Sequence, residues 1–277
     1  MSQVLRVARA ALHQWEEPCI SGTRGSGAIF FSGCVLKCVF CQNRRISAEG
    51  YGKSVTPEAL AERMLSLQAQ GAHNINLVTP THFAEGIRDA LLLAKEQGLC
   101  LPVVYNCGGY EEPEALRALE GLIDVWLPDF KYVSAELAAR YSKKADYPKR
   151  AKAALSEMVR QAGTCRYDKE GMMIKGVLVR HLVLPGHTKE AKAVLRFLFE
   201  EYGNRIAYSI LSQYTPMPYV AEHAPELNRR LTKREYERVA AYAMALGIEN
   251  GYLQEGDVAK ESFIPAFDGT GVGGGRD

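Results

Sequence analysis

Runs of apolar, often β-branched residues recur six times along the chain and predict six buried strands. These runs cover residues 28–32, 74–79, 101–106, 123–130, 175–184 and 206–212. The stretches between and after them carry helical patterns, which cover residues 57–70, 84–97, 114–119, 134–141, 149–161, 189–202 and 232–246. Strands that alternate with helices of this length predict an α/β fold with right-handed crossovers and a mostly parallel sheet.

Several helix boundaries carry their own signals. Thr56 followed by Pro57 is typical of a helix start, because the hydroxyl caps the first turn and proline suits its first position. Gly71, Gly98 and Gly247 stand where three of the helices should end. No repeat of 20 to 50 residues is visible, so a solenoid is not expected.

The two ends of the chain differ from the rest. Residues 1–12 place arginines among small and aliphatic side chains and predict a short amphipathic helix; they lack the apolar core and cleavage site of a signal peptide. Residues 269–277 are rich in glycine and predict a flexible tail. We therefore expect one domain over residues 1–277, with a core at about 22–219, an N-terminal extension at 1–21 and a C-terminal helix and tail at 220–277.

Composition narrows the class of protein. The 277 residues carry 34 Lys and Arg against 32 Asp and Glu, a formal net charge of +2, which argues against binding to nucleic acid or an anionic membrane through charge. No apolar run approaches the roughly 18 residues of a membrane helix. The seven cysteines are an odd number and do not suggest a disulfide framework. We expect a cytoplasmic protein.

Three of those cysteines, Cys34, Cys38 and Cys41, have the spacing Cys-x3-Cys-x2-Cys directly after the first predicted strand. Thiolates grouped in a short loop are typical ligands of a soft metal or an iron–sulfur cluster. Structural zinc takes four ligands and would have to recruit a distant residue, since the other cysteines are scattered. A [4Fe–4S] cluster held by three thiolates leaves one iron open to another ligand. The remaining cysteines are Cys19, Cys100, Cys107 and Cys165.

Polar residues follow the predicted strands at the points where they end. Ligands of α/β barrels and open parallel sheets bind at the carboxyl ends of the strands, so we expect these side chains to converge on one site. In chain order they are Ser32, Cys34, Thr79, Thr81, His82, Asn106, Asp129, Lys131, Arg180, His181, Ser212, Gln213 and Tyr214.

The cysteine segment, with Phe40 before the third cysteine, closely resembles that of the radical S-adenosylmethionine enzymes. Residues 22–33 before it and Gln42-Asn43 after it resemble the activating enzymes of glycyl-radical enzymes, such as the pyruvate formate-lyase activating enzyme. The resemblance continues patchily to about Tyr219, through residues 106–109, 127–131 and 179–186. It implies a partial (β/α)6, TIM-like barrel, a single [4Fe–4S] cluster ligated by the three cysteines, and S-adenosylmethionine chelated to the open iron.

The chain also departs from that family. Residues 78–82, Val-Thr-Pro-Thr-His, stand where the family usually has Gly-Gly-Glu, which holds the amino group of S-adenosylmethionine. Either Thr79 or Thr81 then replaces that contact, and His82 occupies the acidic position. Ser212-Gln-Tyr214 stands where the activating enzyme has a histidine after the sixth strand. These differences indicate a divergent subgroup with its own substrate.

The resemblance also implies roles for single residues. Lys131 and Arg180 supply positive charge for the methionine carboxylate, while Asp129 and Asn106 suit the ribose hydroxyls, the ammonium group or a nearby cation. Phe40 lies against the adenine. Thr79 and Gln213 complete the set of expected cofactor-binding residues. Their alternative roles are ordinary packing and an ion pair at a strand end.

The function expected from this resemblance is reductive cleavage of S-adenosylmethionine to a 5′-deoxyadenosyl radical, which abstracts hydrogen from a substrate. A glycine of a protein partner is one candidate substrate, and a small metabolite or peptide is another. A zinc-stabilised binding protein remains the alternative from a different class. The chemistry needs an electron donor such as flavodoxin or ferredoxin, and the basic segment 143–166 is either its docking surface or a solvated helix face.

Overall fold

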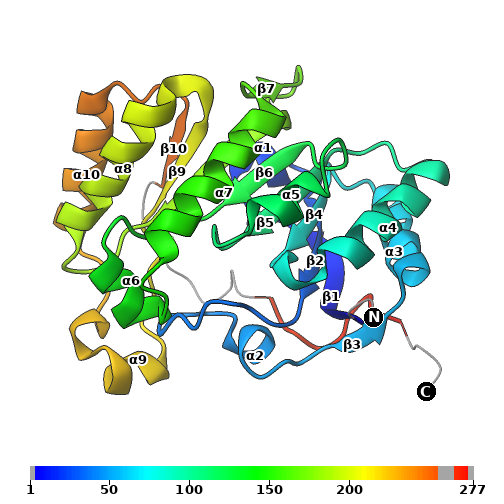
Figure 1. The fold of residues 1–277 in the computed structure, drawn as a ribbon, viewed down its shortest axis with the longest axis horizontal. Coiled ribbons are helices and arrows are strands. Elements are labelled where there is room, and N and C mark those ends of the chain that lie inside the picture. The colour runs from blue at the N-terminus through cyan, green and yellow to red at the C-terminus, as the bar shows by residue number, and fades with distance from the viewer. Residues whose placement is uncertain (1–3, 255–264, 274–277) are drawn as a thin grey trace.

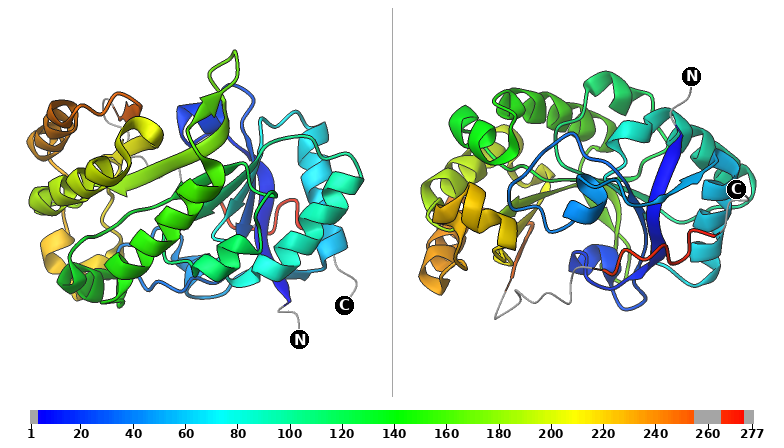
Figure 2. Two further views of the ribbon diagram at one scale, coloured as in Figure 1. Left: turned by 45° about the horizontal axis from the view of Figure 1, so that its top comes forward. Right: turned by 90° about the horizontal axis from the view of Figure 1, so that it is seen from below.

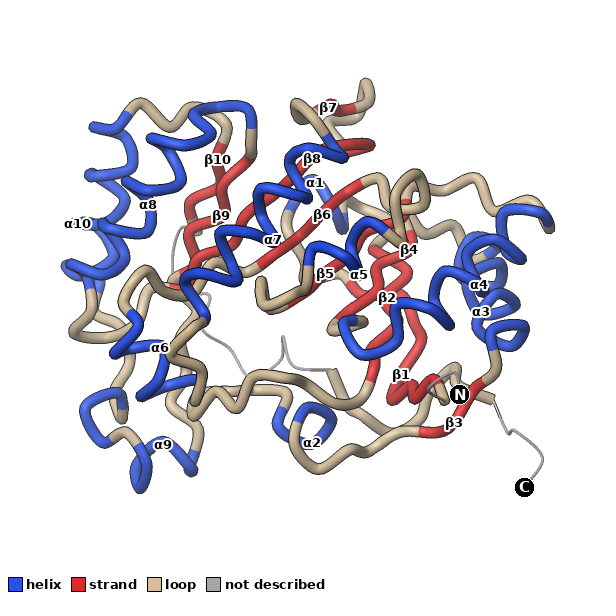
Figure 3. Tube along the Cα trace, in the orientation of Figure 1, coloured by secondary structure: helices blue, strands red, loops and turns tan. Residues whose placement is uncertain are grey.

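The computed structural model describes residues 4–254 and 265–273. Within this part, all six predicted strands are present and lie parallel, in the order β9, β8, β6, β5, β4, β2 across the sheet. The sheet curves into an open barrel, as Figures 1 and 3 show. The strands are β2 (Ser26–Phe31), β4 (Ile75–Val78), β5 (Val103–Cys107), β6 (Val125–Pro128), β8 (Met173–Leu182) and β9 (Ala207–Leu211).

The predicted helices cover the outer face of this sheet (Figures 1 and 2). Each of the seven helical patterns forms a helix whose ends lie within a few residues of the prediction, which confirms the α/β reading. They are α3 (Pro57–Ala69), α4 (Ala84–Glu96), α5 (Pro113–Arg117), α6 (Ala135–Ser142), α7 (Tyr147–Ala162), α8 (Thr188–Tyr202) and α10 (Lys233–Leu246). Shorter helices are α2 (Arg44–Ser47), α9 (Pro218–His223), η1 (Thr81–Phe83), η2 (Gly203–Arg205) and η3 (Pro225–Leu227).

The predicted helix ends are confirmed by their geometry. The Thr56 hydroxyl accepts a hydrogen bond from the Ala59 amide at 3.3 Å, at the start of α3. Gly247 ends α10 in the left-handed conformation, with φ of 88°, where glycine pays no steric penalty.

The amphipathic helix predicted for residues 1–12 is wrong, because residues 5–13 form strand β1 (Leu5–His13). Leu5 and Val7 point into the core while Arg6 between them is exposed, an alternation with the period of a strand. β1 pairs antiparallel with β2 and with β3 (Lys53–Val55), and a bulge lies between Val7 and Arg9. Pairing with β2 supplies the hydrogen bonds that the short pattern alone could not predict.

After β1 the chain crosses the amino-terminal end of the barrel through residues 14–21, which we call the floor segment. It contains the short helix α1 (Pro18–Ser21), whose Cys19 and Ile20 pack against inward-facing barrel side chains. The Asn74 amide donates to the Ile20 carbonyl at 2.7 Å and accepts from the Ser26 hydroxyl at 2.5 Å. The two hydrogen bonds of Asn74 therefore connect the floor segment to the beginnings of β2 and β4.

Two further strands pair with members of the parallel sheet. β10 (Gly251–Leu253) runs parallel to β9, and β7 (Arg166–Tyr167) forms a hairpin with β8. Residues 265–273 run along β1, where the Ala10 amide donates to the Thr270 carbonyl at 2.9 Å and Val272 is buried. The prediction of a flexible tail therefore does not hold for residues 269–273, and residues 274–277 lie outside the described part.

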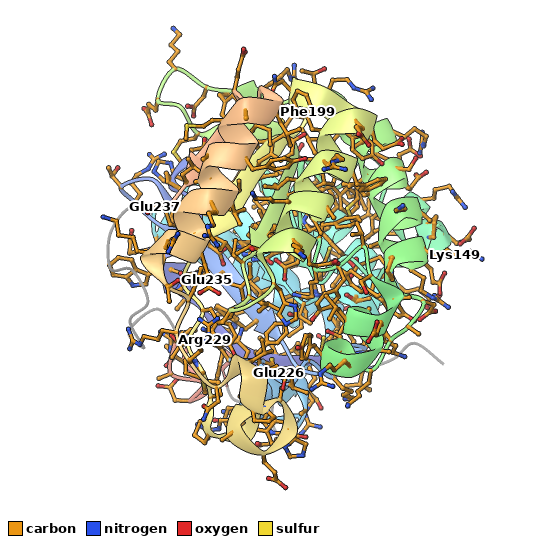
Figure 4. The ribbon with its side chains drawn as sticks, turned by 90° about the vertical axis from the view of Figure 1, so that its left-hand side faces the viewer. Lys149, Phe199, Glu226, Arg229, Glu235 and Glu237 are labelled. Carbon is orange, nitrogen blue, oxygen red and sulfur yellow. The ribbon has the colours of Figure 1, made fainter. Side chains whose placement is uncertain are left out.

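The helices at one flank are joined by an ion pair and a cap. Arg229 and Glu235 lie beside each other at the start of α10 (Figure 4), with Arg229 Nη2 2.7 Å from Glu235 Oε1. Glu235 also accepts from the Gly186 amide at 2.7 Å and forms a capping box with Thr232. This carboxylate fastens α10 to the loop that follows β8. Over the described ranges, no helix is long and apolar enough to cross a membrane.

Candidate active site

A partly buried network of charged side chains occupies the carboxyl ends of β5, β6 and β8, as the strand-end rule predicts. Arg180 Nε donates to Asp129 Oδ1 at 3.0 Å, and Lys131 Nζ donates to Asp129 Oδ2 at 2.6 Å. A backbone bridge joins Asp129 and Arg180 as well. Asp129 thus lies between two cations.

The other two nitrogens of the Arg180 guanidinium also donate hydrogen bonds. Nη2 donates to Asn106 Oδ1 at 2.5 Å, and Nη1 donates to Glu16 Oε2 at 3.2 Å. The Asn106 amide in turn donates to Glu16 Oε1 at 3.3 Å. We call these five residues, Glu16, Asn106, Asp129, Lys131 and Arg180, the Arg180 network.

The charges of this network support one another. Burial alone would raise the pKa of Asp129, but the Lys131 ammonium and the Arg180 guanidinium together hold it below its ordinary value. Burial likewise opposes the charge of Lys131 and Arg180, and the Asp129 carboxylate outweighs it and raises the pKa of both. All three groups are therefore ionised at neutral pH.

Two consecutive carboxylates of the floor segment enter the barrel from below. Besides Glu16, Glu17 is buried and accepts a hydrogen bond from the Ser209 hydroxyl of β9 at 2.7 Å. Burial is the largest influence on both and raises the pKa of each carboxyl above its ordinary value. Asn76 of β4 faces Glu16. Neither polar atom of its fully buried amide makes a hydrogen bond of normal geometry.

Sequence reasoning missed Glu16, Glu17, Asn76 and Ser209 as site residues. Asn76 and Ser209 stand inside strands rather than after them, where a lone polar residue in an apolar run was the available signal. The two glutamates precede Pro18 on a segment whose path depends on the closed barrel. No local sequence signal therefore indicates that they lie inside it.

The three grouped cysteines lie on one loop between β2 and α2, residues 32–43, which we call the cysteine loop. The Sγ atom of Cys38 lies 3.1 Å from the Ser142 hydroxyl, and that of Cys41 lies 3.2 Å from the Ser47 hydroxyl. Burial raises the pKa of the Cys34 thiol to about 12, with smaller effects from its two neighbours. Lys131 favours the thiolate of Cys38 but does not overcome burial, so the pKa of Cys38 is also raised.

This donor set fits a polynuclear group better than a single ion. In the described part of the chain, no three His, Cys, Asp or Glu side chains converge tightly enough to hold one metal ion. A cubane cluster takes one thiolate at each of three irons, so its ligands are spread apart, whereas zinc draws all its ligands to one point. Buried thiols ionise when iron supplies the positive charge.

The cysteine loop is bound to the carboxyl end of α6 and to the segment that follows β9. The Lys37 and Val39 amides donate to the Ser142 and Tyr141 carbonyls at 3.3 and 2.8 Å. Phe40 is buried and packs edge-on against Tyr214, with 6.2 Å between ring centroids.

Gln42 connects the cysteine loop to the segment that follows β9. Its amide lies 3.5 Å from the Gln213 carbonyl, which places the predicted Gln213 beside the loop.

Thr79, at the end of β4, has a strained backbone. Its φ of 57° is a conformation that β-branched residues rarely adopt, and its amide donates to the Asn106 carbonyl at 2.8 Å. Strain of this kind is concentrated at functional sites, where surrounding contacts maintain it. Thr81 instead donates to the buried Glu111 carboxylate at 2.8 Å and so supports the loop rather than facing the network.

Other candidates take structural positions. His82 lies against Gly33 of the cysteine loop, where a Cβ on that glycine would be 3.3 Å from the imidazole. Cys19 and Cys107 are buried, and burial raises the pKa of Cys19 to about 12 and that of Cys107 well above its ordinary value. Both sulfurs therefore remain thiols at neutral pH.

Two cations of the basic segment 143–166, Arg150 and Arg160, form ion pairs with nearby acids. Arg150 Nε lies 2.8 Å from Asp146, and Arg160 Nη2 lies 2.8 Å from both Glu120 and Glu157. These pairs favour the reading of a solvated helix face.

Comparison with known proteins shows similarity to one protein family. A family model described as the Radical SAM superfamily matches residues 28–198, well over half of the chain. The uncharacterized protein MJ0674 of Methanocaldococcus jannaschii is 31% identical over 229 residues, which cover 79% of this chain and 62% of that protein.

Solved structures share the fold at low identity. Streptococcus suis SuiB bound to S-adenosylmethionine superposes with a TM-score of 0.56 at 13% identity, over 82% of this chain and 49% of SuiB. The FeFe-hydrogenase maturase HydG of Carboxydothermus hydrogenoformans gives a TM-score of 0.53 at 11% identity, over 79% of this chain and 50% of HydG. The chain thus spans less than two thirds of each of these proteins.

The buried Glu17 carboxyl predicts a pH-dependent effect on stability. Because its pKa in the folded protein is raised, the folded state favours the protonated form, and this contribution is present below pH 4.5 and lost as pH rises through the folded value. Glutamine resembles the protonated form at every pH. The Glu17→Gln variant should therefore become more stable than the natural protein as pH rises from 4.5 to 8, measured as the urea midpoint. A difference that stays constant with pH would contradict this account, and Glu62→Gln, at an exposed position, is the matched control.

Proposed function

The chain belongs to the radical SAM superfamily, and from that premise we propose that it is an enzyme that generates a 5′-deoxyadenosyl radical to abstract hydrogen from a substrate. The single observation that carries the proposal is the cysteine loop, whose three thiols lie at the same end of the barrel as the Arg180 network. The family implies a [4Fe–4S] cluster and S-adenosylmethionine. When bound, these groups supply the one-electron reductive cleavage of the sulfonium.

The protein's own residues would bind and orient the cofactor. Cys34, Cys38 and Cys41 would ligate three irons and leave the fourth open. Lys131 lies near enough to Cys38 to affect its pKa, so its ammonium would also lie near the methionine carboxylate. Arg180 is already held by two carboxylates and Asn106, so we assign it to positioning Asp129 and Asn106 rather than to a direct contact.

Thr79 and Gln213 would complete the cofactor site at the rim. The strained Thr79 stands at the strand end where the resembled family has its Gly-Gly-Glu, so its hydroxyl is placed to replace that contact. Gln213 would act through its backbone next to the cysteine loop. Phe40, being buried against Tyr214, would support the loop beneath the adenine.

We propose two substrates in the order the residues favour them. The segment before the cysteine loop and Gln42-Asn43 resemble glycyl-radical activating enzymes, which favours a glycine Cα of a protein partner. A peptide or small metabolite is the second candidate, favoured by the replaced Gly-Gly-Glu; SuiB, which shares the fold, is known in complex with a precursor peptide. In either case a flavodoxin or ferredoxin in the cytoplasm would supply the electron.

Anaerobic reconstitution should give about four irons per chain and, after dithionite reduction, the EPR signal of one reduced [4Fe–4S] cluster. Serine at position 34, 38 or 41 should abolish both the cluster and the release of 5′-deoxyadenosine, whereas Cys100→Ser, on the surface, should retain them. Stoichiometric zinc without a cluster would sink the proposal and support the zinc-stabilised binding protein.

Thr79→Gly should weaken S-adenosylmethionine binding about fivefold, as expected for one lost hydrogen bond of about 1 kcal/mol. It should not lower the free energy of unfolding, because relief of about 1–2 kcal/mol of left-handed strain offsets the greater freedom of glycine in the unfolded chain. Equilibrium dialysis and urea titration separate these effects. Thr79→Ser keeps the hydroxyl and should bind normally; equal affinity of the glycine variant would remove Thr79 from the site.

Deuterium transfer distinguishes the two substrates. A glycyl-radical enzyme labelled with α-deuterated glycine should pass deuterium into 5′-deoxyadenosine if the first candidate is correct. Turnover without transfer from the protein, together with transfer from a labelled peptide or metabolite, would establish the second.

A further inference from the structure

Residues 265–273, which we call the strap, lie alongside β1 (Figures 1 and 2). β3 pairs with β1 only at residues 5–7, and beyond that point the Ala10 amide donates to a carbonyl of the strap at 2.9 Å. The Arg9 side chain adds a second contact, because its Nη1 atom donates to the Ala266 carbonyl at 3.0 Å. The strap therefore covers part of an edge of the sheet.

One side chain of the strap packs against the inner face of the barrel. Phe267 is buried and lies edge-on to Phe30 of β2, with 5.5 Å between ring centroids. The neighbours of Phe30 on this strand, Ile29 and Phe31, belong to the core beneath the helices, so Phe30 faces the barrel interior. A segment that follows the last strand thus contributes an apolar ring to the inside of the barrel.

The inner face that Phe267 contacts continues to Thr79. Phe30 is in register with Val78 of β4, and both belong to one buried apolar cluster with Phe267. Thr79 follows Val78 directly, and its φ of 57° persists only if surrounding contacts maintain it. Packing of this cluster around Val78 is one such contact.

The same cluster reaches the cysteine loop. Ile46 of α2 is one of its members, and the Ile46 carbonyl accepts a hydrogen bond from the Gly33 amide at 2.8 Å. Gly33 immediately precedes Cys34. Phe267 therefore packs in a cluster that adjoins two parts of the proposed cofactor site, the end of β4 and the cysteine loop.

We propose that Phe267 is a positioning residue for S-adenosylmethionine, and that it acts by holding Val78 and Thr79 in place from inside the barrel. Removing a buried ring leaves space into which neighbouring groups relax. Because the Thr79 backbone is strained, relaxation lowers its energy and moves its hydroxyl. The inference rests on the proposed function only in treating that hydroxyl as a contact of S-adenosylmethionine.

Protection of the sheet edge is the other role that the strap can have. An uncovered edge presents backbone donors and acceptors to other chains, and natural proteins cover such edges. That role uses the backbone contact at Ala10 and needs no ring against Phe30. The two roles therefore predict different results for substitutions of Phe267.

Equilibrium dialysis of S-adenosylmethionine with the reconstituted protein tests the coupling of Phe267 to Thr79. Phe267→Ala should weaken binding by up to the factor of about five expected for Thr79→Gly. The double variant should bind no more weakly than Thr79→Gly alone, because the group through which Phe267 acts is already lost. Phe267→Leu keeps a large apolar side chain and should retain most of the affinity. Phe197→Ala, which removes a partly buried ring on α8, is the matched control and should bind normally.

Hydrogen exchange without S-adenosylmethionine gives a second readout. The Thr79 amide donates to the Asn106 carbonyl at 2.8 Å, and Phe267→Ala should raise its exchange rate about fivefold or more as the end of β4 loosens. The Phe197→Ala control should leave this rate unchanged.

Gly271→Ala provides an independent variant if Phe267→Ala does not fold. A Cβ at this glycine would collide with the Ala10 carbonyl, so the substitution should displace the strap and reproduce both effects of Phe267→Ala. Gly121→Ala is its control, because Gly121 has a similar φ, 78° against 72°, and open space around it.

The outcomes separate this inference from edge protection and from the proposed function. If Phe267→Ala lowers the urea midpoint but changes neither the affinity nor the exchange of the Thr79 amide, the strap only protects the edge and the inference is overturned. Additive losses of affinity in the double variant would overturn it as well, since Phe267 would then act elsewhere. If the natural protein binds no S-adenosylmethionine while Phe267→Ala still speeds exchange at Thr79, the proposed function fails and the support of Thr79 by Phe267 stands.

Discussion

The contact of Arg180 with Asp129 and Glu16 is the interaction on which the arrangement of the site depends. Burying a guanidinium is costly, and removing one partner from a buried ion pair typically costs about 3–5 kcal/mol because a charge is left uncompensated. Here the guanidinium is met at all three nitrogens by partners from β5, the end of β6 and the floor segment. The Arg180 guanidinium therefore has all its partners only when the barrel is closed and residues 14–21 are in place.

That requirement explains the position of β1. The floor segment can reach Arg180 only if the chain enters the amino-terminal end of the barrel, and antiparallel pairing of β1 with β2 delivers it there. Gly109 shows the same close fit at the other end, because a Cβ at this residue would collide with the Asp129 carbonyl. Its φ of 77° is one that glycine adopts without strain. The close backbone contact with Gly109 and the ion pairs with Lys131 and Arg180 together fix the position of Asp129.

Much of this fold and part of the site could be predicted from the sequence. The six strands are apolar runs with clear ends, so Asn106, Asp129, Lys131 and Arg180 could be brought together by the rule that parallel strands end at one edge. β1 could not, because its alternation is interrupted by a bulge and its stability comes from pairing with β2. Glu16 and Glu17 could not, because an acidic pair before a proline is typical of a surface turn until tertiary contacts bury it.

The position of negative charge in the barrel differs between this chain and the resembled family. The resembled family holds an acidic side chain at the rim, after the second strand, whereas this chain has a threonine and a histidine there and carries carboxylates on the floor segment. Negative charge at the rim stabilises a cation next to the cysteine loop; negative charge on the floor stabilises one deep in the barrel. Since burial makes an uncompensated carboxylate costly, the pKa of Glu17 is raised, and the hydrogen bond from Ser209 and the nearby charge of Arg180 offset part of that cost.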